Sequence, residues 1–596
     1  MTQEQSQDGP ADWARELAAG RGSAAEHWRH LPGWDRGIEM HRLLPQLFRL
    51  LEEASQPGRT SLLEVLADRA DDLRRTRSAH RERALQLYAA EWERIVGLLD
   101  DERAETRRLA ARLLAAVRPG RPEATAALKD RAGVESSPET LARLLTAVGA
   151  QGPGDGAAAW LRCWLDHPAP PVRLSAALAL LELPDGDGAG VDGLGERAAR
   201  LLGEPGAWQA RPYPLAGPFG RALRDRPREA ARFVTALAGR PGGTEQRVAV
   251  GVAIEQLRRR RRPAEAHWRT VLGTGKGEGS HEARLLLARS GRALAPYADE
   301  LLALVEAEPG DTWLREGALV ALVALGDRRV LPYYRDEFGG QLLPVGAPPP
   351  DWAADLLPTV RRVLGRAKRL RRWEVRGLDE ALRVARSWGP AAAPLAQKLT
   401  ALLDAPSITA RAAAEALGEI GSQAAPAAGE LARLATGRPW HGAQTAAWAH
   451  WRITGDPGLA LRTVGAAARA GLGHPVYRYL AALGPLALDF AEPVRELLDA
   501  PGEFSRVGAA VAWWRITGDP APALPVLLRQ LAGPADGTAG EPTLRAVRLL
   551  GEIGAPAGVA APPLRALLAA ERRHGATIAL DEELCAAART ALERLG

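Results

Sequence analysis

Apolar residues recur along the chain at the spacing of an α-helix. After Thr106 they fall at Ala110, Leu113, Leu114 and Val117, which together lie on one helix face. The same spacing follows Val172 and Leu314. No stretch alternates apolar and polar residues over a strand's length, so strands are not expected. The pattern predicts an all-α protein whose helices each bury one face.

Near-identical segments reveal a repeat. Ten of twelve residues from Ala446 to Pro457 match those from Ala509 to Pro520, 63 positions later, and Leu-Gly-Glu-Ile-Gly occurs at 417–421 and at 550–554. The glycines that close successive copies lie 34, 29, 34 and 36 residues apart: Gly421, Gly455, Gly484, Gly518 and Gly554. A period near this length is typical of stacked helix pairs, so we expect one extended solenoid of about fourteen to sixteen pairs.

The sequence Ile-Thr-Gly-Asp-Pro, found in two copies, predicts where helices stop and start. Its glycine suits the left-handed conformation just past a helix end. Asp456 and Asp519 can cap the next helix, and the proline after each fits that helix's first position. Trp451 and Trp514 precede the motif by a turn, and we expect them to be buried between repeats rather than to form a ligand cage.

Acidic residues precede arginines by seven positions in five repeats. The acid falls at a turn and the arginine in the following helix, so stacking predicts a ladder of opposite charges. The five pairs are Asp100/Arg107, Asp166/Arg173, Glu308/Arg315, Asp404/Arg411 and Asp499/Arg506.

This pattern resembles the Asp/Arg ladder of HEAT repeats. The short Ala-rich units that close on Leu-Gly resemble the bacterial HEAT-like class of phycobilisome-lyase-type proteins. The resemblance covers most of the chain and is strongest over 97–185 and 400–596. It implies an α-solenoid of HEAT-like helix pairs with a curved concave surface, and it implies no particular activity.

Composition shifts predict the domain organisation. Residues 1–95 lack the repeat but hold helical segments at Met40–Glu53 and Leu62–Leu73, and we expect a helical N-terminal cap there. Degenerate HEAT-like repeats follow over 96–338. A connector is expected at 339–352, because three consecutive prolines, Pro348 to Pro350, cannot lie inside a helix. Further HEAT-like repeats fill 353–596.

Composition and charge point to a soluble chain. Of the 596 residues, 78 are basic and 72 acidic, and only four of the basic ones are lysine. This arginine excess is typical of a GC-rich bacterial genome such as an actinomycete's, so a net charge of +6 does not by itself indicate nucleic acid. No signal peptide or membrane span is evident, and two cysteines cannot form a disulfide framework. We expect a cytoplasmic protein.

Candidate catalytic motifs do not hold up. Gly275-Lys276 lacks the residues of a phosphate loop, and His27, His30 and His41 lack further metal ligands. Cys163 lies in an apolar helical segment and is expected to be a buried, inert thiol. We therefore expect no enzyme activity, no cofactor and no metal site.

Two basic clusters remain as candidate binding residues. In the segment 361–376 the apolar residues trace one helix face and the basic residues the other, although a solvated face in an arginine-rich chain gives the same pattern. The first cluster is Arg258, Arg259, Arg260, Arg261 and Arg262; the second is Arg361, Arg362, Arg366, Lys368, Arg369, Arg371, Arg372 and Arg376.

These features favour a non-enzymatic binding scaffold that holds a protein or peptide partner on the concave surface. The alternative is a nucleic-acid or other polyanion-binding protein, or a protein resembling HEAT-like DNA-repair glycosylases, which would use the basic segment 361–376. A third hypothesis, a lyase or chaperone acting on a modified partner, rests on the phycobilisome-lyase resemblance alone. Nothing in the sequence sets the oligomeric state.

Overall fold

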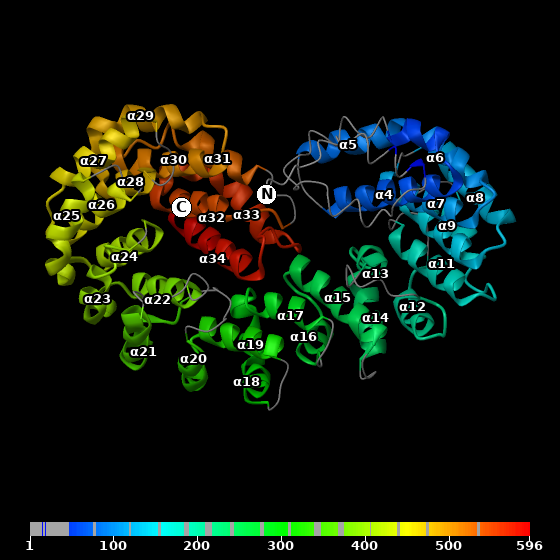
Figure 1. Ribbon diagram of the computed structural model, residues 1–596, viewed down its shortest axis with the longest axis horizontal. Coiled ribbons are helices and arrows are strands. Elements are labelled where there is room, and N and C mark those ends of the chain that lie inside the picture. Colours follow the sequence, from blue (N-terminus) through cyan, green and yellow to red (C-terminus); the bar gives the residue numbers. More distant parts are fainter. Residues whose placement is uncertain are drawn as a thin grey trace, which may run out of the picture. The chain divides into compact units, whose positions relative to one another are not determined.

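Helices build the part of the chain that this computed structural model describes, and that part contains isolated β-bridges but no strand (Figure 1). The all-α solenoid expected from the apolar spacing is therefore confirmed. The structure describes residues 15, 18–19 and 47–595, except 76–78, 119–120, 153–155, 184–189, 209–216, 239–242, 275–278, 308–311, 339–346, 367–374, 406, 438–441, 472–475 and 533–536.

The chain divides into two compact units. Unit 1 comprises residues 1–256 and 264–270, and unit 2 comprises residues 257–263 and 271–596. The helices that begin in unit 1 are α4 (Gln56–Arg75), α5 (Ala79–Ala90), α6 (Trp92–Gly97), α7 (Ala104–Val117), α8 (Pro122–Val134), α9 (Pro138–Gln151), α10 (Ala157–Arg162), α11 (Pro170–Glu182), α12 (Leu194–Leu202), α13 (Gly217–Ala222), α14 (Pro227–Leu237), α15 (Thr244–Arg259) and α16 (Glu265–Leu272).

Unit 2 continues the helix pairs and adds short 3-10 helices between them. Its α-helices are α17 (Ser280–Leu287), α18 (Ala298–Glu306), α19 (Thr312–Leu325), α20 (Leu331–Glu337), α21 (Ala353–Arg366), α22 (Val375–Trp388), α23 (Ala396–Thr400), α24 (Ser407–Ile420), α25 (Ala428–Thr436), α26 (Ala443–Thr454), α27 (Gly458–Arg469), α28 (Val476–Leu483), α29 (Ala491–Glu496), α30 (Glu503–Thr517), α31 (Leu524–Leu531), α32 (Glu541–Ile553), α33 (Ala561–Ala569) and α34 (Ile578–Leu595). The 3-10 helices are η2 (Gly291–Tyr297), η3 (Arg328–Val330), η4 (Pro350–Trp352), η7 (Gly389–Leu395), η8 (Gly421–Ala427), η9 (Gly484–Phe490), η10 (Leu497–Asp499) and η11 (Ala555–Ala560); η1 (Leu98–Asp100) lies in unit 1.

The helices of unit 2 form two layers. Helices α22, α24, α26, α28, α30, α32 and α34 pack one against the next as an inner layer, and the helices between them form the outer layer (Figure 1). In unit 1, α7, α9 and α11 pack in the same consecutive way. The apolar sets recognised after Thr106 and Val172 are buried throughout, because α7 packs against α4, α6 and α9, and α11 packs against α9, α12 and α13.

All five repeat-closing glycines have positive φ angles, and Gly455 and Gly518 have the left-handed conformation predicted for them. Their φ angles are 74° at Gly421, 78° at Gly455, 57° at Gly484, 71° at Gly518 and 72° at Gly554. In three of these repeats the chain then runs straight into a 3-10 helix that leads to the outer α-helix: η8, η9 and η11.

The Asp-Pro start signal is confirmed in one copy and wrong in the other. Asp456 accepts a hydrogen bond from the Gly458 N–H at 2.9 Å, and α27 begins there. Asp519 accepts from the Ala521 N–H at 2.9 Å, but the residues after it form a turn and α31 begins only at Leu524.

The two ends of unit 2 meet. The last helix, α34, packs against η2, and the Ala579 N–H donates to the Arg289 carbonyl at 3.0 Å. Unit 2 is thus a closed circuit rather than the open array expected from the repeat (Figure 1). Between α20 and α22 the circuit is completed by side-chain contacts such as Tyr334–Glu380, at 2.8 Å, rather than by close helix packing.

The predicted boundaries at 95/96, 338/339 and 352/353 stay predictions. Nearly all of residues 1–46 of the expected N-terminal cap lie outside the described residues, whereas the expected helical segment Leu62–Leu73 lies within α4. Residues 339–346 of the expected connector also lie outside them. The end of that segment is well packed, since Trp352 is fully buried and the Pro348 carbonyl accepts from Trp388 Nε1 at 2.9 Å.

Candidate binding surfaces

The arginine run Arg258–Arg262 is built into the joint that closes unit 2. Arg258 and Arg259 form the last turn of α15, and Arg260 makes an antiparallel bridge with Arg572. Arg261 extends its guanidinium to the last repeat, where it meets the Asp581 carboxylate at 2.9 and 3.0 Å. At least part of this cluster therefore already has a partner within the chain.

Asp581 is the centre of that joint. Its side chain is 1% exposed, and it accepts from Arg261, from the N–H groups of His574 and Gly575 at 2.9 and 3.2 Å, and from Arg573 at 3.5 Å. Burial alone would raise the pKa of Asp581, but the Arg261 guanidinium and the backbone N–H groups together hold it below its usual value. The carboxylate is thus fully hydrogen-bonded and charged.

The second basic cluster falls largely outside the described residues. Arg361, Arg362 and Arg366 are exposed on the last turns of α21, which ends at Arg366. Lys368, Arg369, Arg371 and Arg372 lie in the segment 367–374, of which the structure describes nothing, and only the backbone of Arg376 is described, at the start of α22.

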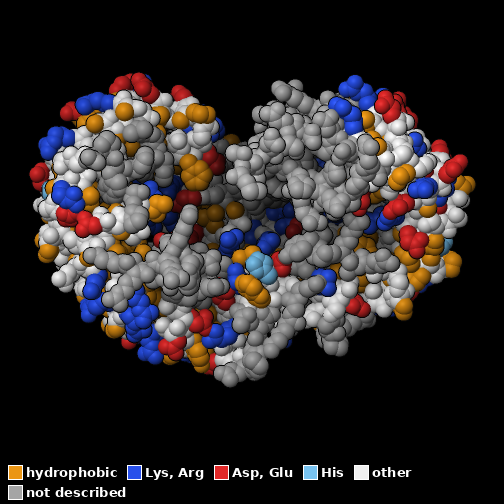
Figure 2. All heavy atoms as spheres, in the orientation of Figure 1, with side chains coloured by type: hydrophobic (Ala, Val, Ile, Leu, Met, Phe, Trp, Pro, Cys, Tyr) orange, Lys and Arg blue, Asp and Glu red, His pale blue; other side chains and the backbone are white. Residues whose placement is uncertain are grey.

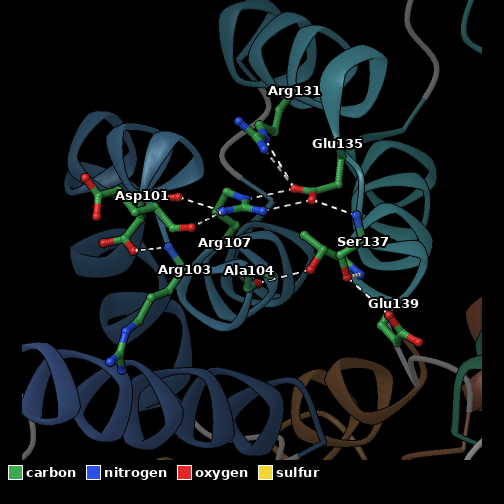
Figure 3. Close-up of polar contacts among 10 residues, drawn as sticks. Asp101, Arg103, Ala104, Arg107, Arg131, Glu135, Ser137 and Glu139 are labelled. Atoms are coloured by element: carbon green, nitrogen blue, oxygen red, sulfur yellow. Dashed lines mark hydrogen bonds and ion pairs between the residues drawn. The ribbon is translucent and has the colours of Figure 1, made fainter.

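The repeated arginines bind backbone carbonyls rather than the acids seven positions earlier. Arg107 donates to the carbonyls of Asp101 and Glu102 at 2.8 Å each (Figure 3). Arg173 and Arg506 make the same two bonds, to His167 and Pro168 and to Ala500 and Pro501. These bonds satisfy carbonyls of the turn before the helix, which have no helical partner.

The carboxylate partners of these arginines also differ from the predicted ladder. Arg107 forms a two-point pair with Glu135, and Arg173 pairs with Glu204. Asp166 and Asp404 bind other arginines instead, Arg197 at 2.7 Å and Arg433 at 3.4 Å. The ladder was therefore wrong in its pairs, although the structural role given to the arginines was right for Arg107, Arg173 and Arg506. Glu308 lies outside the described residues.

Arg–Glu pairs cross between inner helices of unit 2. Arg386 of α22 meets Glu415 of α24 at 2.6 Å. Arg478 of α28 reaches across α26 to Glu419 of α24 at 3.3 Å, passing 5.4 Å from the centre of the Trp448 ring. Two further pairs continue the series at 2.8 and 3.1 Å: Arg515–Glu552 and Arg548–Glu583. Acidic and basic side chains are likewise interspersed over the molecular face in view (Figure 2).

The buried tryptophans of the two matching repeats are not the expected ones. Trp448 and Trp513 are 4% and 8% exposed, whereas Trp451 and Trp514 are half-buried. Trp448 rests on Gly418 of α24, where an added Cβ would lie 2.4 Å from the ring. The first glycine of Leu-Gly-Glu-Ile-Gly at 417–421 is therefore the position where two helices cross closely. The recurrence of this motif in the sequence did not by itself indicate that role.

Other candidate chemistry is sparse. Cys163 is exposed at the end of α10, so the buried thiol expected there was wrong: the neighbouring Leu161, not Cys163, faces inward. Within the described residues, no group of three or more His, Cys, Asp or Glu side chains could hold a metal ion. Gly275-Lys276, His27, His30 and His41 lie outside those residues. None of the helices described is long and apolar enough to cross a bilayer.

Comparison with known proteins yields structural similarity only. No family model and no curated protein matches the chain. A structure of Kap95p with RanGDP is 13% identical, with a TM-score of 0.35, and the match covers 98% of this chain and 88% of that one. Kap121p bound to Pho4p is 10% identical at 0.42, over 98% and 75%. The S. pombe condensin Cnd3-Cnd2 subcomplex is 12% identical at 0.29, over 98% and 86%. These are helical repeat proteins, and at such scores they carry no argument about function.

Proposed function

We propose that this protein is a binding scaffold whose unit 2 holds an extended segment of a protein partner along its inner helices. The observation that supports this most directly is the series of partly exposed Arg–Glu pairs on α22, α24, α28, α30, α32 and α34. The series continues across repeats, so it offers a long surface rather than a single spot.

The chemistry of this surface suits a polypeptide. Each pair offers both donors and acceptors, and an extended backbone presents N–H and C=O groups that need both. Consecutive packed helices lie about 8–10 Å apart, so neighbouring pairs are a few residues apart along an extended chain. The mixed charges do not favour a partner of strongly single sign.

An exposed aromatic side chain lies on α19, a helix of unit 2 that packs against α17. Trp313 of α19 is 45% exposed, and the Arg284 guanidinium of α17 lies 4.2 Å from its ring centre. Tryptophan and arginine are both enriched among the residues that contribute most to protein interfaces. A partly exposed Trp–Arg pair supports binding of a protein partner.

Site-specific photo-cross-linking tests this function. A photoreactive residue at Arg411 or Arg452, which are exposed on α24 and α26, should give one discrete protein adduct in the producing cells. Matched controls are Arg462 and Arg565, exposed on the outer helices α27 and α33. Equal adducts at all four positions, or none at the inner ones, would contradict binding on the inner layer.

Polyanion binding stays a second candidate because of α21. Three arginines, Arg361, Arg362 and Arg366, are exposed on its last turns. Among the described residues, the contact found for them is a long bond of 3.4 Å from Arg361 to the Pro394 carbonyl. Since α21 is an outer helix, such binding would use a different face from the one proposed for the protein partner.

A further inference from the structure

Beside the packing of α34 against η2, an extended segment that lies against the last repeat helps to close unit 2. Residues 259–261, at the end of α15 and just after it, run beside residues 571–573, and the two stretches exchange backbone hydrogen bonds. The Arg261 N–H donates to the Glu571 carbonyl at 3.0 Å, and the Arg573 N–H donates to the Arg259 carbonyl at 2.7 Å. This is strand-like pairing between residues more than 300 positions apart.

The Arg261 side chain anchors the segment to the last repeat. The Arg261 guanidinium lies between the Asp581 carboxylate and the end of α33, where it donates to the Leu567 and Ala570 carbonyls at 2.6 and 3.2 Å. From the other side, Arg573 Nε donates to the Leu257 carbonyl at 3.1 Å. The exposed fractions of the Arg261, Arg573 and Asp581 side chains are 14%, 4% and 1%, so the charges meet away from bulk water.

The joint differs in kind from the packing between neighbouring inner helices. There, apolar side chains and close-approach glycines hold one helix against the next, as Trp448 does on Gly418. At the joint, charged groups and backbone bonds form much of the contact. Hydrophobic contact is non-directional and tolerates small shifts, whereas a buried ion pair loses its stabilisation abruptly once its geometry is lost.

We propose that this joint is a latch: the last repeat binds the segment 257–263 as an arginine-bearing peptide in cis, and unit 2 opens by releasing it. In the closed state, Asp581 holds Arg261 and the inner helices form a circuit. In the open state, the 257–263 segment leaves the last repeat while the helix pairs stay folded. The proposal stands apart from the proposed function, because it concerns only how unit 2 closes.

The chain carries its own reporter of this opening. It has two cysteines, and Cys585 lies on α34 one turn after Asp581, 7% exposed, whereas Cys163 is exposed. Residues four positions apart lie on the same face of a helix, so the Cys585 thiol lies beside the Asp581 carboxylate of the latch. An aromatic disulfide reagent such as DTNB should therefore modify Cys163 at once and Cys585 only through the open state.

The test measures the DTNB reaction of Cys585 in full-length protein carrying Cys163→Ser. Arg261→Ala leaves Asp581 without its main partner, and we expect the Cys585 reaction to become about a hundredfold faster. The matched control is Arg262→Ala, which removes the neighbouring arginine, for which no contact with Asp581 is found. It should change the rate by less than about twofold.

Hydrogen exchange separates opening of the latch from melting of α34. The amides of Arg261, Arg573 and Ala579 bond across the joint, so their exchange should rise in Arg261→Ala while the amides in the middle of α34 keep their protection. Equal Cys585 rates in the two variants would overturn the proposal, and so would loss of protection throughout α34. If Arg261→Ala fails to fold, amide exchange is compared within the unmodified chain. If the amides at the joint are then as strongly protected as the amides in the middle of α34, the proposal of a releasable latch is contradicted.

Discussion

The Arg107–Glu135 pair allows a quantitative test of how the repeats of unit 1 are joined. Arg107 donates from Nε and Nη2 to the two carboxylate oxygens of Glu135 at 2.8 Å each, and the exposed fractions of the two side chains are 8% and 0%. Glu135 also accepts from Arg131 and from the Ser137 N–H at 3.1 and 3.0 Å (Figure 3). Glu135→Gln keeps the size of the side chain and removes its charge, which leaves Arg107 buried without a counter-ion.

The magnitude follows from the pKa of Glu135. Burial alone would raise that pKa, but the hydrogen bonds from Arg107, Ser137 and Arg131 lower it from its usual 4.5 to about 2. A drop of this size corresponds to about 3 kcal/mol of stabilisation by the charged form. Because the folded-state pKa is the lower one, this stabilisation is fully present above pH 4.5 and is lost as the pH falls towards 2.

Hydrogen exchange of α7 and α9 measures the effect. At neutral pH, Glu135→Gln should speed amide exchange in both helices by about a hundredfold, as about 3 kcal/mol implies. The unmodified protein should lose protection there between pH 4.5 and 2, and the variant should lose less, because its side chain does not titrate. The control is Glu139→Gln, which changes an exposed neighbouring carboxylate that accepts a hydrogen bond from Ser137 Oγ at 3.2 Å. Exchange in Glu135→Gln within about threefold of that control would refute the assignment.

Three further changes test the repeat packing and the polyanion alternative. Gly418→Ala should destabilise unit 2 by about 1–3 kcal/mol in urea unfolding, because the added Cβ meets the Trp448 ring. The control is Gly429→Ala in α25, whose added Cβ meets nothing within 4 Å and which should be neutral or stabilising. Equal effects of the two changes would contradict the close crossing of α24 and α26 at Gly418. Gly518→Ala forces a side chain onto a φ of 71° and should lower stability by about 1–2 kcal/mol in the same assay, and no loss would count against the left-handed turn. On the polyanion hypothesis, binding of random duplex DNA should weaken steeply as the salt concentration rises, and a flat salt response would exclude that hypothesis. The slope of the log binding constant against log salt concentration should fall by about 1 for each arginine that alanine replaces among Arg361, Arg362 and Arg366.

Repeat geometry could be predicted from the sequence because it depends on local rules. Helix faces follow from a period of 3.6 residues, and the closing glycines at Gly455 and Gly518 follow from the left-handed turn that each helix end requires. Both depend on neighbours in the chain. The ion-pair partner of a side chain does not depend on its neighbours in the chain, so the predicted ion pairs were less accurate. The spacing predicts a pair of Arg107 with Asp100, but Arg107 binds Glu135, 28 residues later in the sequence.

The closing joint could not have been predicted from sequence patterns. Its partners, Arg261 and Asp581, are 320 residues apart, and neither belongs to a recurring motif. A run of five arginines looks the same in sequence whether it is solvated, binds a polyanion or holds an internal carboxylate. Likewise, Trp448 and Trp451 lie on the same helix, and only the crossing of α24 and α26 decides which ring is buried.

The closed circuit of unit 2 changes how its repeats share stability. In an open array each repeat is stabilised by its neighbours, and the terminal repeats, with one neighbour each, fray first. When the ends of unit 2 join, its first and last repeats gain a second neighbour, so local melting must break two interfaces wherever it starts. We therefore expect unit 2 to unfold with greater cooperativity than a linear array of the same repeats, and a cut at the joint to restore end fraying.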